Sequence, residues 1–203
     1  MKVLILGATG MLGHKLYQDL GQNFEVWGTI RGEVSELDVY GFYNAEKIIG
    51  SVDAADIGSV QRALNIACPD VVVNAIGAIK QVAAGNDPID ALTVNSIFPQ
   101  KLAKLTDHRG ARLITVSTDC VFSGKKGNYN ETDSPDATDL YGISKRFGEP
   151  SGAKVLTLRT SIIGRELRSQ HGLVEWFLSQ RGTTVPGYVN AVFSGLTTIA
   201  LAR

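Results

Sequence analysis

The feature that most constrains the fold is a series of short, almost wholly apolar runs that alternate with helical segments. "KVLIL" (Lys2–Leu6) and "DVVVNAIG" (Asp70–Gly77) lack the alternation of apolar and polar residues that one exposed sheet face would produce. Strands of this kind are covered on both faces, as in a parallel sheet between two layers of helices. The repeated strand–helix units therefore predict an α/β fold with a doubly wound parallel sheet and right-handed crossovers.

The same criteria give the order of the remaining elements. We expect further strands at Phe24–Ile30, Lys47–Asp53, Ala111–Ser117 and Lys154–Arg159, and helices at Met11–Leu20, Ile57–Ala67, Ile89–Thr106, around Tyr141 and at His171–Arg181. The last residues, "LTTIALAR", read as the start of an apolar helix with little to pack against, so we expect a truncated chain.

Composition excludes several classes of protein. Among 203 residues, 20 basic side chains balance 20 acidic ones, so no overall charge favours binding to nucleic acid or to an anionic membrane. Cys68, Cys120 and three scattered histidines form no metal-binding pattern, which predicts no metal and a reducing, cytoplasmic location. No apolar run is long enough to span a membrane, so we expect a soluble protein. A homo-oligomer is left open.

A glycine-rich loop follows the first strand directly. "GATGMLG" places Gly7, Gly10 and Gly13 between that strand and a helix. This spacing allows a tight turn, the approach of a diphosphate to the backbone, and close packing of the helix on the sheet. Backbone amides at the helix start then receive the anion. The pattern predicts a dinucleotide site that also includes Thr9, Met11 and Leu12; the alternative is a purely structural turn.

Residues at other strand ends complete the predicted cofactor site. The end of the second strand, "WGTIRG", offers Arg31 in place of the acid that usually binds the ribose of NAD. A guanidinium suits a 2′-phosphate, so NADP(H) is favoured, with NAD(H) possible and an ordinary loop arginine as the alternative. Asp53 is positioned to reach an adenine amino group. The other residues expected beside the cofactor are Ala54, Asn74, Ala75, Ile76 and Ser117.

A phenol and an ammonium share one helix face in "LYGISKRFGE". Tyr141 and Lys145 stand four positions apart and therefore project from the same side. An adjacent cation would lower the pKa of the phenol toward the range useful for acid–base chemistry. The alternative is a solvated surface pair. Thr118, at the end of the fifth strand, could hydrogen-bond a substrate carbonyl where parallel strands face a ligand.

At this point the sequence resembles the extended short-chain dehydrogenase/reductase family. Within that family, "STDCVFSG", "YNETDSP", "YGISKRFGE" and "LRTSIIG" are similar to the dTDP-4-dehydrorhamnose reductase branch of nucleotide-sugar reductases. The resemblance implies a Rossmann domain at residues 1–166 that binds NADP(H), and part of a substrate-binding region at residues 167–203. It also implies that Tyr141 is the catalytic acid, that Lys145 binds the nicotinamide ribose, and that Thr118 completes the triad.

The reaction implied by the resemblance is the NADPH-dependent reduction of a nucleotide-linked 4-keto-6-deoxy sugar for surface polysaccharide synthesis. Cys120 stands where many members of the branch have tyrosine, so the substrate could differ. Three alternatives remain. A dehydratase would usually place glutamate after Thr118-Asp119, and an epimerase would show a serine-rich strand end. A non-catalytic, regulatory NADP(H)-binding subunit is the third.

Overall fold

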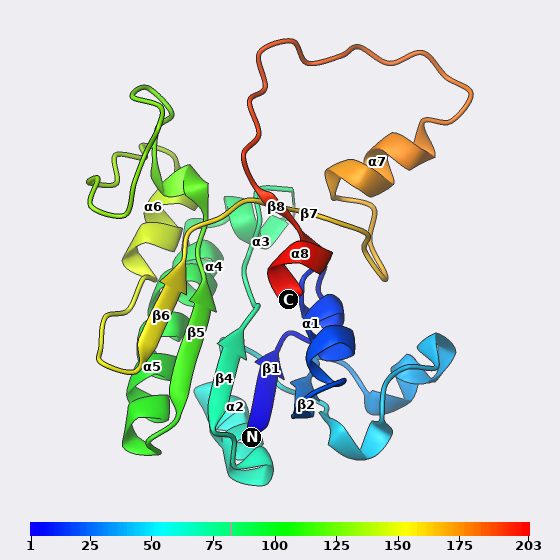
Figure 1. Ribbon diagram of the computed structural model, residues 1–203, viewed down its shortest axis with the longest axis vertical. Helices are drawn as coiled ribbons and strands as arrows, with labels where there is room; N and C mark the ends of the chain where they lie inside the picture. The colour runs from blue at the N-terminus through cyan, green and yellow to red at the C-terminus, as the bar shows by residue number, and fades with distance from the viewer. Residues whose placement is uncertain (82) are drawn as a thin grey trace.

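The computed structural model describes residues 1–81 and 83–203, and its main sheet has six parallel strands. Their order is β3-β2-β1-β4-β5-β6, with the strand order reversing between β1 and β4 (Figure 1). Ligands of such sheets bind outside the carboxyl ends of the strands at this reversal. The predicted doubly wound α/β fold is therefore confirmed. The strands are β1 (Lys2–Leu6), β2 (Glu25–Thr29), β3 (Ile48–Ile49), β4 (Val71–Asn74), β5 (Arg112–Val116) and β6 (Val155–Leu158).

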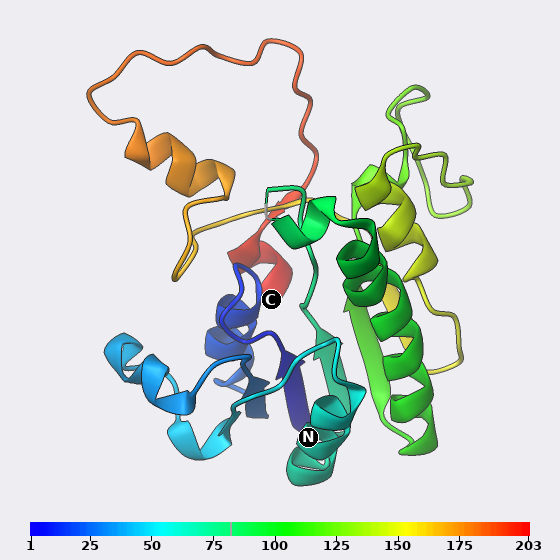
Figure 2. The ribbon, with the colours of Figure 1, turned by 180° about the vertical axis from the view of Figure 1, so that it is seen from behind.

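Helices cover both faces of this sheet. α1 (Gly13–Leu20) and α8 (Thr198–Ala202) lie on one face in Figure 1, while α2 (Ile57–Ala67) and α5 (Phe98–His108) lie on the other in Figure 2. The residues of β1 alternate between the two cores. Val3 and Ile5 pack into the core that contains α1, whereas their neighbours in the strand pack into the core beneath α2 and α5. Burial on both faces explains why the strand is apolar throughout.

The segment between β4 and β5 is less regular than the single helix predicted at Ile89–Thr106. It contains α3 (Ala83–Asn86), α4 (Pro88–Leu92), a π-helical segment η3 (Thr93–Ile97) and α5. Asn95 lies in the π-helical segment and is fully buried. Its side chain bonds the backbone of Ala78 rather than solvent. The break in the α-helical pattern therefore coincides with a tertiary contact. Such π-bulges are frequent at functional sites.

The connection from β2 to β3 holds two 3₁₀ helices that the sequence did not predict, η1 (Val34–Tyr40) and η2 (Ala45–Lys47). The strand predicted at Lys47–Asp53 pairs only at β3, because the edge position gives it one neighbour, β2. α2, in contrast, has the predicted bounds. Asp56 caps it by accepting a hydrogen bond from the amide of Gly58 at 3.0 Å.

The end of the chain packs against its beginning. After α7 (Leu173–Ser179), β8 (Leu196–Thr197) pairs in parallel with β7 (Ile162–Ile163), and α8 then lies beside α1 (Figure 1). Ala202 joins the core on this face, and Arg203 approaches Asp19 at 3.7 Å. The expectation that this last helix would find little to pack against is therefore wrong. The domain boundary at residue 166 stays a prediction.

Among residues 1–81 and 83–203, no helix combines the length and the apolar character needed to cross a membrane.

Candidate active site

The glycine loop has the geometry that its sequence predicts. Gly7 adopts φ +83°, a left-handed conformation that favours glycine. A Cβ added to Gly13 would lie 2.9 Å from the carbonyl carbon of Gly7, and closer still to its oxygen. The start of α1 therefore approaches the loop so closely that no side chain fits at Gly13.

Three side chains outside the glycine motif hold this loop in place. The amide of Gly7 donates to Oγ1 of Thr29 at 3.3 Å, and the hydroxyl of Tyr43 donates to the carbonyl of Ala8 at 2.8 Å. Nδ1 of the buried His14 lies 2.9 Å from the carbonyl of Gly10. These supporting roles were not predicted from the sequence, because each depends on a contact between segments or on burial rather than on a motif.

The loop presents backbone donors at the start of α1. Among the described residues, none accepts a hydrogen bond from the backbone amides of Met11, Leu12 or Gly13. Gly10 is exposed and Thr9 is half-buried beside them. This concave backbone, kept clear of side chains by the glycines, fits a diphosphate bound at a helix N-terminus.

The remaining predicted cofactor residues are distributed over neighbouring strand ends. Arg31 follows β2, is exposed, and forms no ion pair with a described residue. The carboxylate of Asp53 accepts from the amide of Ala55 at 2.8 Å, while Ala54 is buried in the core.

The residues after β4 lie against the glycine loop. Asn74 is buried, and its side chain bonds Thr115 and the amide of Ile76. A Cβ on Gly7 would meet the side chain of Ile76 at 3.0 Å and the backbone of Ala75 at 3.5 Å. The structure thus brings this predicted group next to the loop, and gives Asn74 a structural role.

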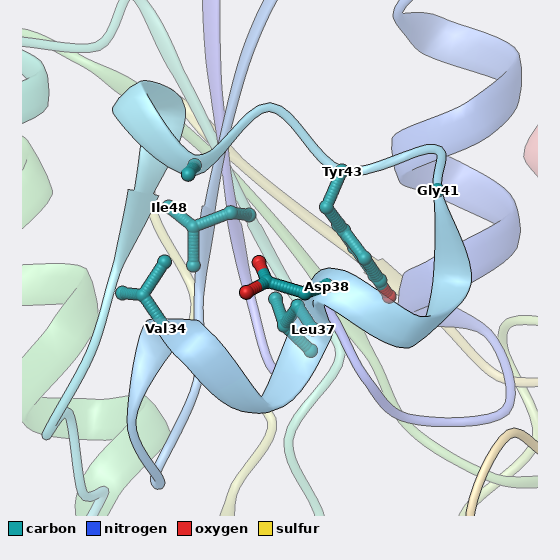
Figure 3. Close-up of a pocket in the computed structure, with 7 residues that line it drawn as sticks. Val34, Leu37, Asp38, Gly41, Tyr43 and Ile48 are labelled. Atoms are coloured by element: carbon teal, nitrogen blue, oxygen red, sulfur yellow. The ribbon is translucent and has the colours of Figure 1, made fainter.

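A separate pocket lies between η1 and β3 (Figure 3). It has a volume of about 160 Å³, and none of the predicted catalytic or cofactor-binding residues lines it. Tyr43 forms one wall, and its hydroxyl is the donor to Ala8 described above. The pocket is therefore connected to the glycine loop through one side chain. Its lining residues are Val34, Leu37, Asp38, Gly41, Tyr43, Ala45 and Ile48.

The three predicted catalytic residues come from two elements that pack together. Tyr141 and Lys145 lie on α6 (Leu140–Phe147), which contacts η4 (Asp119–Val121). Thr118 caps η4 by accepting from the amide of Cys120 at 3.1 Å, and its hydroxyl also interacts with that of Tyr141. Lys145 is only 8% exposed, and its ammonium donates to the carbonyl of Val116, the last residue of β5, at 2.7 Å.

The ionisation of Tyr141 differs from the sequence-based prediction. Burial raises the pKa of Tyr141 to about 12; Cys120, Asp119 and Asp139 also raise it, and the hydrogen bond with Thr118 acts in the opposite direction. Lys145 is not among the groups that shift this pKa. The expected lowering by Lys145 is therefore wrong for this chain, because desolvation of the phenolate is the largest effect and the ammonium of Lys145 is directed to the carbonyl of Val116.

Lys145 itself is strongly affected by its surroundings. Burial lowers the pKa of Lys145 to about 8, while the carboxylate of Glu149 acts to raise it. At neutral pH the phenol of Tyr141 is therefore protonated and able to donate, and Lys145 still carries most of its charge. A neutral acid beside a buried ammonium is suited to protonate a developing alkoxide.

Close packing fixes the position of α6. A Cβ on Gly148 would lie 2.8 Å from the carbonyl carbon of Asn95, and a Cβ on Gly142 would clash with the backbone of Cys120. The side chain of Asn95 donates to Oγ of Ser144 at 3.1 Å. These contacts join the helix that carries Tyr141 to η3 and η4, and none of them has a local sequence signal.

Ser117 belongs to a second polar network. Its hydroxyl donates to the carboxylate of Glu149 at 2.6 Å, so its proton is engaged and its oxygen can only accept a further hydrogen bond. Its place beside the cofactor stays a prediction. Arg159 donates to the same carboxylate through Nε at 3.0 Å and through a terminal nitrogen at 2.8 Å. The network links the ends of β5, α6 and β6 around the lysine of the site.

The chain is similar to two kinds of curated protein. The chain is 34% identical over 169 residues to a dTDP-4-dehydrorhamnose reductase of Burkholderia thailandensis, covering 79% of this chain and 50% of that protein. It is 32% identical over 163 residues to methionine adenosyltransferase 2 subunit beta of Bos taurus, covering 77% of this chain and 46% of that protein. The chain thus spans about half the length of these curated relatives.

Solved structures agree with the similarity to the reductase. A dTDP-4-dehydrorhamnose reductase of Clostridium acetobutylicum superposes on the whole chain with a TM-score of 0.79 at 26% identity, and 68% of that chain is covered. The Bordetella bronchiseptica enzyme WbmG, in complex with NAD and UDP, matches 88% of this chain and 58% of its own, with a TM-score of 0.70 at 25% identity.

A protein-family model also matches most of the chain. Residues 1–181 match the family described as RmlD substrate binding domain. This range includes the glycine loop, the strand ends and all of α6. The resemblance to the dTDP-4-dehydrorhamnose reductase branch, inferred from four motifs, is confirmed by these findings, and the chain belongs to the RmlD substrate binding domain family.

Proposed function

We propose that this chain carries the catalytic part of an NADPH-dependent reductase of a nucleotide-linked 4-keto-6-deoxy sugar, which acts in the cytoplasm in surface polysaccharide synthesis. One observation carries the proposal. A protonated phenol, a threonine hydroxyl and a buried ammonium meet at the carboxyl end of β5, on the same sheet as an open glycine cradle. Binding sites of doubly wound sheets form at this edge.

The cradle and the strand ends suit a nicotinamide dinucleotide. The amides of Met11, Leu12 and Gly13 would hold the diphosphate, and exposed Arg31 would pair with a 2′-phosphate. NADP(H) is therefore the proposed cofactor. The relative WbmG was solved with NAD, so NAD(H) is the competing choice, and Arg31 is the residue that decides between them.

Each catalytic side chain has a defined task in this proposal. A bound NADPH supplies the hydride to the carbonyl carbon of the sugar. Tyr141, whose phenol is protonated at neutral pH, donates its proton to the carbonyl oxygen as charge develops there. Thr118 hydrogen-bonds the same oxygen and steadies the developing charge. Lys145, buried and mostly charged, would hold the nicotinamide ribose.

The substrate class rests on the relatives and on the site together. A UDP-bound relative and a dTDP-sugar reductase both favour a nucleotide-linked sugar. The direct test is to incubate the protein with NADPH and a panel of dTDP- and UDP-linked 4-keto sugars, and to follow the loss of nicotinamide absorbance. Oxidation of NADPH that depends on the keto sugar, with formation of the reduced sugar nucleotide, supports the proposal. Absence of oxidation throughout the panel, despite NADPH binding, contradicts it.

A second candidate function is a regulatory, non-catalytic role. The observation that favours it is the 32% identity to a methionine adenosyltransferase subunit. The same panel separates the two functions. A regulatory subunit binds NADPH without consuming it, and changes the activity of a partner enzyme instead.

A further inference from the structure

A second lysine lies against the catalytic tyrosine. Lys80, in the loop after β4, places its ammonium 5.5 Å from the ring centroid of Tyr141. The same ammonium forms an ion pair with the carboxylate of Asp139 at 3.0 Å. The residue is exposed, so its contacts are with the rim of the site rather than with the core. A cation over an aromatic face is attracted by the ring quadrupole.

Asp139 connects this lysine to the helix of the tyrosine. It is the N-cap of α6, and its carboxylate accepts from the amide of Gly142 at 3.2 Å. Burial acts to raise the pKa of Asp139, but hydrogen bonds from Gly142 and Lys80 lower it overall, so the group is ionised at neutral pH. From a different segment of the chain, Lys80 thus bonds the N-cap of α6 and also lies over the ring of Tyr141, two residues after that cap.

The other charged groups around Tyr141 act against its ionisation. Asp119 and Cys120 on η4, together with Asp139, disfavour the phenolate. α3, η3 and α4 also pack against α6. The first two carry no titratable side chain, and α4 carries only the exposed Asp90. Lys145 directs its ammonium to Val116. Lys80 therefore supplies positive charge on a side of the ring where carboxylates otherwise dominate.

We propose that Lys80 is a positioning residue for Tyr141: lying over the phenol ring and paired with Asp139, it fixes the orientation of the ring and balances the charge of the carboxylate that caps α6. The proposal rests on the proposed function, because proton donation by Tyr141 is the step that Lys80 serves. It gives the loop after β4 a part in the reaction, in addition to the parts of Thr118, Tyr141 and Lys145.

The first test measures turnover of NADPH with the keto sugar that the wild type reduces. Lys80→Met is expected to lower kcat roughly fivefold, the effect of one cation–π contact of ordinary strength, with the dissociation constant of NADPH unchanged. Lys80→Arg keeps the charge and should restore most of the rate. Asp139→Asn retains a good cap but breaks the ion pair. Its effect should not add to that of Lys80→Met, because the two residues act as a unit.

Lys126→Met is the matched control. Lys126 also pairs with a carboxylate, Asp133, and lies 5.9 Å over a tyrosine ring, that of Tyr129, in the loop after η4. Its removal should leave kcat unchanged. Equal losses in the two methionine variants, or a normal kcat in Lys80→Met, would overturn the proposal.

A second measurement does not need turnover, so it separates failure of this inference from failure of the proposed function. In protein labelled with ¹³C at the phenol carbon of tyrosine, the resonance lost in Tyr141→Phe identifies the ring, and its chemical shift is measured at neutral pH, where lysine and arginine side chains are charged. Because a cation over the ring face changes the electronic environment of the ring, Lys80→Met should shift this resonance. Lys80→Arg, which keeps the charge, should stay close to the wild type. Superimposable Tyr141 resonances of wild type and Lys80→Met would refute the role of Lys80, whether or not the protein reduces a sugar.

Discussion

Gly13→Ala is the substitution for which the structure gives the most definite expectation. An added Cβ would lie 2.9 Å from the carbonyl carbon of Gly7 and 3.1 Å from Cα of Ala8. Non-bonded heavy atoms pack best at about 3.5–4.0 Å, and the carbonyl oxygen of Gly7 lies closer still to the added Cβ, so α1 and the loop must separate by more than about 1 Å. The neighbours are backbone atoms, which cannot rotate away. Overpacking of this kind costs about 1–3 kcal/mol, and the helix propensity of alanine returns at most about 1 kcal/mol.

The displacement should also weaken the cradle for the diphosphate. We expect the affinity for NADPH, measured by quenching of protein fluorescence, to fall at least about tenfold, which corresponds to about 1.4 kcal/mol. Urea unfolding should show a destabilised protein. Gly187→Ala is the control, because no described atom lies within 4 Å of the position that its added methyl group would take, and its φ is not positive. A Gly13→Ala variant as stable as the wild type, with unchanged NADPH affinity, would refute this reasoning.

Three further substitutions test separate parts of the site. Arg31→Leu should weaken NADPH binding about tenfold and leave NADH binding nearly unchanged, since only NADPH carries the 2′-phosphate; equal losses for both cofactors would contradict this. Lys145 has a pKa of about 8 in the folded chain and an ordinary value of 10.5, so the unfolded chain holds more protons between these pH values. The free energy of unfolding, relative to Lys145→Met, should therefore rise with pH across this window, by at most about 3 kcal/mol; a flat difference would contradict the burial argument. Glu149→Gln should destabilise the protein by about 2 kcal/mol in urea unfolding, because it leaves the charge of Arg159 unpaired; no change would show that the pair contributes little.

The parts of the fold that the sequence predicted well are those with local signals. β1 has the predicted bounds because its run of apolar residues is buried on both faces, and α2 has them because Asp56 supplies an N-cap. The length of an edge strand and the place where tertiary contacts interrupt a helix have no such local signal. β3 is limited to Ile48–Ile49 by its single neighbouring strand, and η3 contains Asn95, whose partners lie in other segments.

The same distinction applies to the site. The turn at Gly7 and the close packing at Gly13 could be predicted from the glycine motif, because backbone geometry explains its spacing. The pKa of Tyr141 does not follow from its spacing to Lys145, because burial of the ring is a property of the folded chain. Ser117 shows a similar limit. Its place at a strand end was predictable, but its hydroxyl bonds Glu149, which is distant in the sequence.

Single-turnover oxidation of NADPH by the wild type and by Tyr141→Phe, each with saturating keto-sugar nucleotide, tests the central claim most directly. The phenylalanine ring fills the same space but has no proton to donate. We expect the variant to bind NADPH with nearly unaltered affinity and to lose at least about a hundredfold in the rate of hydride transfer. Transfer at the wild-type rate by Tyr141→Phe would contradict the assignment of this phenol as the catalytic acid.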